Sequence, residues 1–220
     1  MLAVAVIVFR ETLEAALIVS IVLAASVGIS RRTIWVGTGI AAGIFGACLV
    51  ALFAAAIATA FAGSGQELLN ATILLLAVVM LAWHNIWMAR HARELAAQAG
   101  TLGRAVAAGT RPLAALAVIT GVAVLREGSE TVLFVFGIAA SAQGGVVPMV
   151  AGVALGLLAG VTAGSLLYVG LLRIPVHKLF TVTGWMVLLL AAGLAAQAAG
   201  FLVQADLLPP LGTQVWNTSW

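Results

Sequence analysis

Residues 10–14 are Arg-Glu-Thr-Leu-Glu in the middle of an apolar run, and residues 126–130 are Arg-Glu-Gly-Ser-Glu in the middle of another. These segments, called here the first and second motifs, hold four of the chain's seven acidic residues. Moving one charged side chain to the centre of a bilayer costs about 2.5–3.5 kcal/mol on insertion scales. Charges at such positions therefore require a functional or structural reason.

The composition is that of an integral membrane protein. Of 220 residues, 64% are hydrophobic and only 8% are charged, whereas a soluble domain carries about 25% charged residues. The net charge of +3 does not indicate nucleic-acid binding, because the basic residues are scattered between apolar runs. The single cysteine, Cys48, lies in an apolar run, so we expect a small packing residue rather than a disulfide or a thiolate metal ligand.

Six apolar runs are long enough to cross a bilayer, which takes about 20 residues. The first lacks a positively charged leader and carries the first motif, so we interpret it as a retained span and not a signal peptide. The predicted fold is therefore all-α, a polytopic membrane helical bundle. The connection 90–111 is long and polar, and its composition predicts an interfacial helix. The spans are 3–27, 34–60, 67–89, 112–139, 147–171 and 179–199.

Basic residues outside the motifs fall only in alternate connections, those after the first, third and fifth spans. The other connections and the tail, 200–220, contain none. Because positively charged loops stay in the cytoplasm, both termini are predicted to lie outside a cytoplasmic membrane, with an extracytoplasmic tail. The basic residues are Arg31, Arg32, Arg90, Arg93, Arg104, Arg111, Arg173 and Lys178.

The two motifs are predicted to lie on antiparallel helices, because the first span runs inward and the fourth runs outward. This is the pattern of an inverted repeat within one transmembrane domain, 1–199, with 1–90 as repeat one and 112–199 as repeat two. Small residues support this pairing because they let helices approach closely. The fifth span has a stripe of Gly152, Gly156, Gly160 and Gly164, and the second has Gly39, Gly43 and Gly46.

Each motif places two glutamates three residues apart, so both carboxylates lie on one face of the helix. If the two helices cross near the midplane, Glu11, Glu14, Glu127 and Glu130 form one cluster of oxygen ligands. Carboxylate oxygens suit hard cations such as Fe(III), Mn(II), Mg(II) and Ca(II). We therefore predict a cation path with these four glutamates as metal ligands.

Arg10 and Arg126 precede the second glutamate of their motifs by four residues, within side-chain reach. Four ionised glutamates and two arginines leave a net charge of −2, which a divalent cation neutralises. The arginines can also occupy the carboxylates of an empty site, so we predict a charge-tuning role for them. The competing interpretation is buried ion pairs that only fix helix registry, although such pairs give little net stability.

Three further polar residues are candidate accessory sites. His84, in the third span, is a candidate metal or proton relay, although a packing histidine is the simpler interpretation. Glu67 and Asp206, near the outer side, could draw cations inward, against the default of solvated surface. The sequence has no HExxH, GxSxG, Walker A or CxxC pattern, so we expect neither an enzyme nor a permanently bound cofactor.

At its two motifs the chain resembles the oxidase-dependent iron permease family, which includes the fungal high-affinity iron permease and bacterial EfeU-type iron permeases. That family carries Arg-Glu-x-x-Glu in its first and fourth spans, and 197–206 and 215–220 also resemble bacterial members. The resemblance implies iron uptake across the cytoplasmic membrane, with the motif glutamates as ligands of the transported iron. It also implies an extracytoplasmic partner that oxidises or delivers iron: a multicopper oxidase, a cupredoxin-like protein or a haem peroxidase.

Family members usually have a seventh span after this tail, so the resemblance implies either a piece that ends before that span or a six-span variant. Three rival functions stay open: a permease for another cation such as lead or manganese, a metal-binding scaffold or sensor without flux, and a proton-coupled carrier of an organic cation. A homo-oligomer also stays open.

Overall fold

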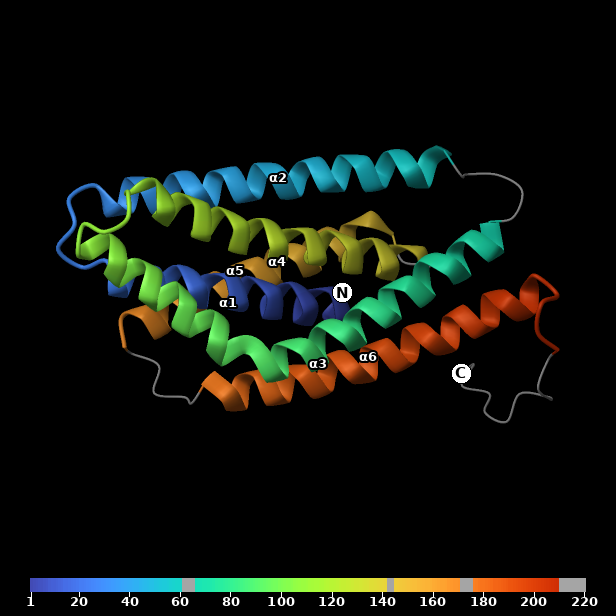
Figure 1. Ribbon diagram of the computed structural model, residues 1–220. Coiled ribbons are helices and arrows are strands. Elements are labelled where there is room, and N and C mark those ends of the chain that lie inside the picture. The colour runs from blue at the N-terminus through green and yellow to red at the C-terminus, as the bar shows by residue number, and fades with distance from the viewer. Residues whose placement is uncertain (61–65, 142–144, 171–175, 210–220) are drawn as a thin grey trace.

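The apolar runs form helices because a bilayer offers the backbone no hydrogen-bond partners, and a helix satisfies its own. The computed structural model describes residues 1–60, 66–141, 145–170 and 176–209. Over these segments the chain forms six α-helices and no strand, arranged as an elongated bundle (Figure 1), which confirms the predicted fold class. The helices are α1 (Leu2–Ala25), α2 (Arg32–Ala60), α3 (Gln66–Ala107), α4 (Ala114–Ser141), α5 (Val146–Tyr168) and α6 (Val176–Gln204).

The outer surface of the bundle is apolar, as a lipid-facing surface must be. Large side chains such as Phe45, Phe53 and Leu158 are exposed on it. Among the described residues, α2, α3, α5 and α6 each contain a stretch long and apolar enough to cross a membrane. Helices α1 and α4 carry the two charged motifs. The protein is therefore an integral membrane protein with its motif charges on two of its helices.

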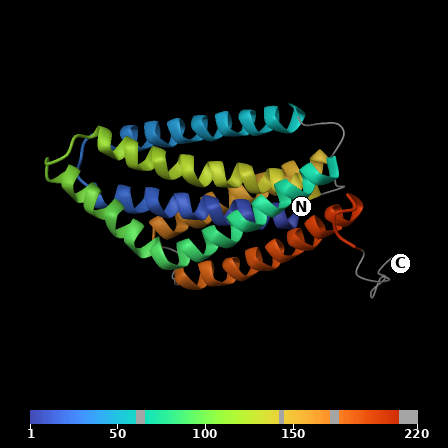
Figure 2. The same cartoon turned by 45° about the vertical axis from the view of Figure 1, so that its right-hand side comes forward.

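Helix α1 lies at the centre of the bundle and packs against each of the other described helices. Helix α4 adjoins it and runs in the opposite direction (Figures 1 and 2). The most extensive interfaces join α2 to α4, α5 to α1 and α3 to α6. The second helix of each half thus packs against the motif helix of the other half.

The packing on the two motif helices follows one pattern. A Cβ added to Gly43 of α2 would lie 2.7 Å from the carbonyl oxygen of Gly121 in α4. A Cβ added to Gly156 of α5 would lie 2.7 Å from the carbonyl oxygen of Ala5 in α1. Gly121 and Ala5 stand at the same place in the sequence, five residues before the motif arginine. The other residues nearest to these added Cβ atoms also stand at matching places in the two motif helices. They are Val124 and Leu125 of α4 for Gly43, and Val8 and Phe9 of α1 for Gly156.

Such a correspondence between halves is what an inverted repeat produces. The close approach also explains why glycine occupies these positions in α2 and α5, because only a residue without a side chain lets two helix backbones come this near.

Helix α3 differs from the prediction of a span at 67–89 followed by a separate interfacial segment. One helix of 42 residues continues to Ala107 and bends part-way along (Figure 1). If straight, it would measure about 63 Å at 1.5 Å per residue, about twice the hydrocarbon thickness. The arm after the bend belongs to the bundle, because it packs against the ends of α1 and α4. The buried apolar cluster there is Val22, Val36, Ala99, Val106 and Leu116.

Helix α6 continues to Gln204, past the predicted end of the sixth span at 199. The end of a helix does not locate the membrane boundary, so the extracytoplasmic tail at 200–220 stays a prediction. The prediction for Cys48 was wrong. Cys48 is exposed rather than packed in the core, because α2 presents its glycine face to α4 and Cys48 lies off that face. The rest of the tail, 210–220, lies outside the described residues.

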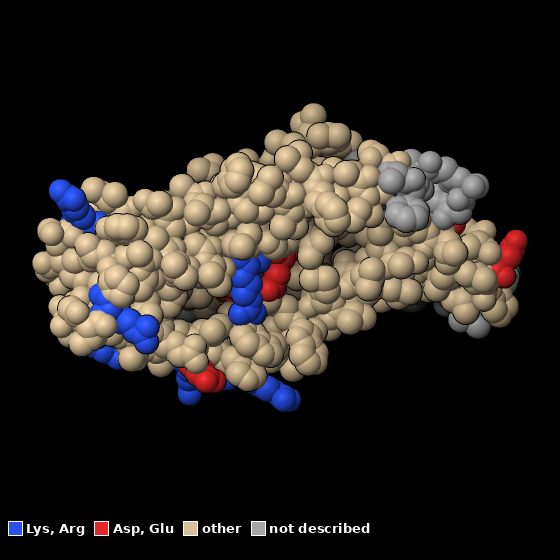
Figure 3. Space-filling model, turned by 45° about the horizontal axis from the view of Figure 1, so that its top comes forward, with Lys and Arg blue, Asp and Glu red and all other residues tan. Residues whose placement is uncertain are grey.

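The connections α1–α2 and α3–α4, which carry Arg31 and Arg111, lie at one end of the bundle (Figure 1). Figure 3 shows basic side chains gathered toward that end. It also shows a basic and an acidic side chain together in a hollow about half-way along the molecule.

Gly43→Ala is expected to destabilise the bundle by about 1–3 kcal/mol, because the added methyl group meets backbone atoms of α4 that cannot move aside. Gly37→Ala on the same helix is the matched control, since nothing lies within 4 Å of its added Cβ, and it should be neutral or stabilising. Thermal unfolding of the purified protein in detergent measures both variants. Equal losses in the two variants would contradict the close α2–α4 approach.

Candidate metal centre

The first motif lies on α1 and is sealed from the surface. Arg10, Glu11 and Glu14 are all buried, because successive turns of α1 place them on its inward face. Arg10 Nη1 donates to Glu11 Oε1 at 3.0 Å, and Arg10 Nη2 lies 3.0 Å from Glu14 Oε1. One arginine thus spans both carboxylates, as the spacing of four residues predicted.

The second motif lies on α4 and is more open. Glu127 is buried, whereas the Arg126 side chain is 33% exposed and that of Glu130 is 17% exposed. Arg126 Nε donates to Glu130 Oε1 at 3.1 Å and lies 3.8 Å from Glu127 Oε1. The guanidinium carbon stands 4.3 Å from the centre of the Trp87 ring, a cation–π contact. Arg126 is therefore held mainly by Glu130 and Trp87, and only weakly by Glu127.

His84 of α3 joins the two motifs. Its Nε2 lies 3.4 Å from Glu11 Oε2 and 3.5 Å from Glu14 Oε2, and its Nδ1 contacts Glu130 Oε2. The ring is buried and packs edge-on against Phe134 of α4. Groups from α1, α3 and α4 therefore meet at one point.

One ligand atom from each of four residues, Glu11, His84, Glu127 and Glu130, can be chosen so that all lie within 4.8 Å of one another. A cation placed among them would have three carboxylates and an imidazole around it, with Glu14 beside the imidazole. Such a mixed oxygen and nitrogen set suits divalent transition metals.

The cluster contains more hydrogen-bonding capacity than the surrounding protein uses. Within the described residues, nine of its buried side-chain atoms make no hydrogen bond, although most of them lie in ion-pair contact with Arg10, Arg126 or His84. A buried polar or charged group without a partner costs several kcal/mol, so native proteins leave few of them. The atoms are Arg10 Nε, one oxygen of Glu11, both oxygens of Glu14, both nitrogens of His84, both oxygens of Glu127 and one oxygen of Glu130.

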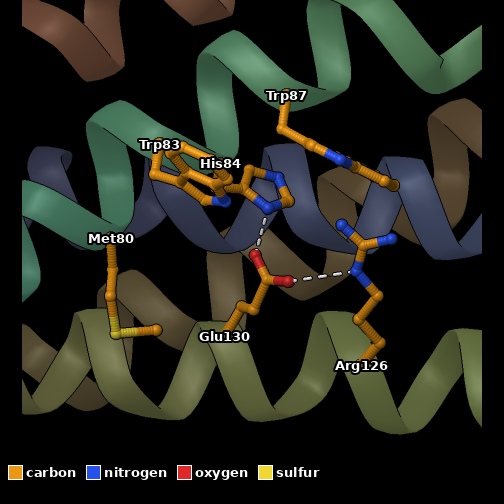
Figure 4. A pocket seen from close by; sticks show the side chains of 6 residues that line it. All are labelled: Met80, Trp83, His84, Trp87, Arg126 and Glu130. Atoms are coloured by element: carbon orange, nitrogen blue, oxygen red, sulfur yellow. Dashed lines mark hydrogen bonds and ion pairs between the residues drawn. The ribbon is translucent and has the colours of Figure 1, made fainter.

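A hollow of about 180 Å³ opens onto this cluster between α3 and α4. Figure 4 shows His84 and Arg126 on either side of the Glu130 carboxylate within it. The residues that line it are Met80, Trp83, His84, Trp87, Arg126 and Glu130. The second motif, unlike the first, can therefore be reached from outside the cluster.

The structure brings together all four predicted glutamates, both arginines and His84. It does not bring Glu67 or Asp206 there: Glu67 is in the first turn of α3, Asp206 follows α6, and both are exposed. Sequence reasoning missed Trp87, which contacts Arg126. Its position, one turn after His84 on the same helix, was the signal that could have identified it.

Comparison with known proteins gives one family and a set of relatives. The iron permease FTR1 family matches residues 1–218. The ferrous iron permease EfeU of Escherichia coli O6:H1 is 35% identical over 208 residues, which cover 91% of this chain and 73% of the relative. EfeU of Yersinia pestis is 32% identical over 207 residues, with 91% and 72% covered.

The protein of Escherichia coli K12 named "putative inactive ferrous iron permease EfeU" matches at the same 35% identity and the same coverage as the O6:H1 protein. No solved structure matches the chain.

Arg10→Met is expected to destabilise the protein by about 3–5 kcal/mol, because it leaves two buried carboxylates without their cation. Arg126→Met is the matched comparison and should cost less, since Arg126 is partly exposed and pairs closely only with Glu130. Thermal unfolding without added metal measures both. A larger loss in Arg126→Met than in Arg10→Met would contradict the assignment of the first motif as the sealed one.

Proposed function

Since this chain belongs to the iron permease FTR1 family, we propose that it imports iron through the carboxylate cluster formed by its two motifs. Relatives named ferrous iron permease match most of its length. We propose Glu11, Glu14, Glu127 and Glu130 as the groups that hold iron during passage, with iron as substrate and no permanently bound cofactor.

The observation that carries this proposal is the set of buried carboxylate oxygens that, within the described residues, accept no hydrogen bond. Glu127 is the strongest case, since both its oxygens lack hydrogen bonds within the described residues and its arginine is 3.8 Å away. A cluster built only for registry would pair its charges with one another, because a buried charge without a partner is costly. A bound cation supplies the missing partner for several carboxylates at once.

The two arginines have different roles in this proposal. Arg10 is fixed between Glu11 and Glu14 and neutralises part of the negative charge in every state. Arg126 is the mobile counter-charge, because it is partly exposed and its guanidinium already stands beside Trp87. When iron binds Glu130, Arg126 can withdraw onto the Trp87 ring and keep a favourable contact. Because Arg126 leaves Glu130 when iron arrives, the net charge of the site is similar in the empty and the loaded states. This similarity favours the release of iron.

We propose that the end carrying Arg31 and Arg111 faces the cytoplasm, because positively charged loops stay inside. Both termini then lie outside, and iron moves from the end near Glu67 toward the basic end. In this orientation Glu67 and Asp206 are exposed where they could attract cations, and an iron-oxidising or iron-delivering partner would act on that side.

Glu127→Gln is expected to abolish iron uptake into proteoliposomes without abolishing folding, because the amide keeps the shape of the side chain but not its charge. Glu14→Gln and Glu130→Gln should lose uptake as well. Radioactive iron supplied as Fe(II) and as Fe(III) identifies the transported form. Glu94→Gln is the matched control, since Glu94 is exposed on α3 and hydrogen-bonded to Gln98.

Normal uptake by a well-folded Glu127→Gln protein would contradict the site assignment. Iron binding by the parent chain without flux would favour the scaffold or sensor interpretation. Faster uptake of lead or manganese than of iron in a competition assay would assign the same pathway to another cation.

Orientation is tested by single cysteines in a Cys48→Ser background. Glu67→Cys is expected to react with a membrane-impermeant maleimide in intact spheroplasts, whereas Arg93→Cys should react only after permeabilisation. Both residues are exposed on α3, so accessibility within the protein does not distinguish them. The opposite labelling pattern would reverse the proposed orientation.

A further inference from the structure

We infer that His84 is a direct metal ligand and that it sets the preference of the site for Fe(II) over harder divalent cations. This inference rests on the proposed function, and it adds a nitrogen donor from a helix that carries neither motif. It assigns to α3 a chemical role beyond covering the bundle.

The geometry places His84 between the motifs rather than beside them. Nε2 faces the carboxylates of Glu11 and Glu14 at 3.4 and 3.5 Å, and Nδ1 contacts the carboxylate of Glu130. A metal-bound histidine commonly uses one ring nitrogen as ligand and donates from the other to a carboxylate. His84 has a carboxylate beside each nitrogen, so this arrangement is available to it with either nitrogen as the ligand.

His84 is buried, and the polar groups that its ring nitrogens face are all carboxylates: those of Glu11 and Glu14 at Nε2 and that of Glu130 at Nδ1. His91, on the same helix, is a histidine whose ring nitrogen bonds to the backbone instead. Its ring stacks on Trp87, and its Nδ1 lies 3.0 Å from the Trp87 carbonyl oxygen as a donor. His84 makes no comparable bond to the backbone among the contacts described, and both of its nitrogens point at groups that bind cations.

The chemical consequence is selectivity. Four carboxylates alone form an all-oxygen site, which suits Mg(II), Ca(II) and Mn(II). An imidazole nitrogen favours Fe(II) over Mn(II), because affinity for nitrogen ligands rises along the first transition row in that direction. Replacing the imidazole should therefore reduce the preference for Fe(II) more than it reduces binding of Mn(II).

The test compares equilibrium binding of Fe(II) and Mn(II), under anaerobic conditions, to the full chain in lipid nanodiscs. In His84→Gln the ratio of the Mn(II) Kd to the Fe(II) Kd is expected to fall by about tenfold, the scale on which a single metal-site group acts. His91→Gln is the matched control and should keep the parent ratio. Because binding is measured without flux, the result does not depend on transport activity.

A spectroscopic readout separates ligation from a merely structural role. Electron spin-echo modulation of bound Mn(II) is expected to show nitrogen coupling in the parent chain and in His91→Gln, and to lose it in His84→Gln. If His84→Gln fails to fold, the double variant His91→Gln/His177→Gln replaces it. The chain has three histidines, so incorporation of ¹⁵N-histidine into that variant should change the coupling only if His84 is bound.

An unchanged Mn(II)-to-Fe(II) ratio in folded His84→Gln, or nitrogen modulation that does not respond to ¹⁵N-histidine, would overturn the inference while leaving the carboxylate site in place. Failure of the proposed function has a different signature. The parent and Glu127→Gln would then bind Fe(II) equally weakly, which would overturn both.

Discussion

The enclosure of a net negative cluster by apolar helices is the constraint on which the structure depends. Four glutamates inside a bundle of apolar helices require nearby cations and exclusion of lipid, and each requirement is met by a particular element. Helices α1 and α4 lie antiparallel with their motifs facing each other. Helices α2 and α5 approach them across glycines, so close that a Cβ would meet backbone atoms. Helix α3 adds the imidazole that lies between the two sets of carboxylates.

The two motifs share a sequence pattern but not an environment. Helix α3 presents His84 and Trp87 to the second motif, and a hollow opens there. Helix α6, which packs against α3, presents Val187, Ala191 and Leu194, which belong to the apolar cluster that contains Ile7 of α1. The sealed motif holds its arginine buried between two carboxylates, whereas the open motif leaves its arginine partly exposed. A repeat in sequence thus produces two chemically different halves of one site.

Local spacing made the motif chemistry predictable from sequence. Glutamates three residues apart and an arginine four residues before the second share a helix face in any helix, and glycines at four-residue spacing indicate close packing. The antiparallel pairing followed from the alternation of basic connections. The length of α3 could not be predicted from the sequence, because its polar second arm is held by tertiary packing of Ala99 and Val106. The position of His84 also depends on how α3 crosses α4, which residue order does not reveal.

Each half of the chain provides the cover for the motif helix of the other half. A nascent chain that has inserted only α1, α2 and α3 holds Arg10, Glu11 and Glu14 without α5, the main neighbour of α1. At that stage the glycine face of α2 also lacks α4, the helix it fits. The three charged residues of α1 therefore remain incompletely covered by protein until the second half of the chain has been synthesised. The interior of this protein cannot assemble in the order in which its helices are made.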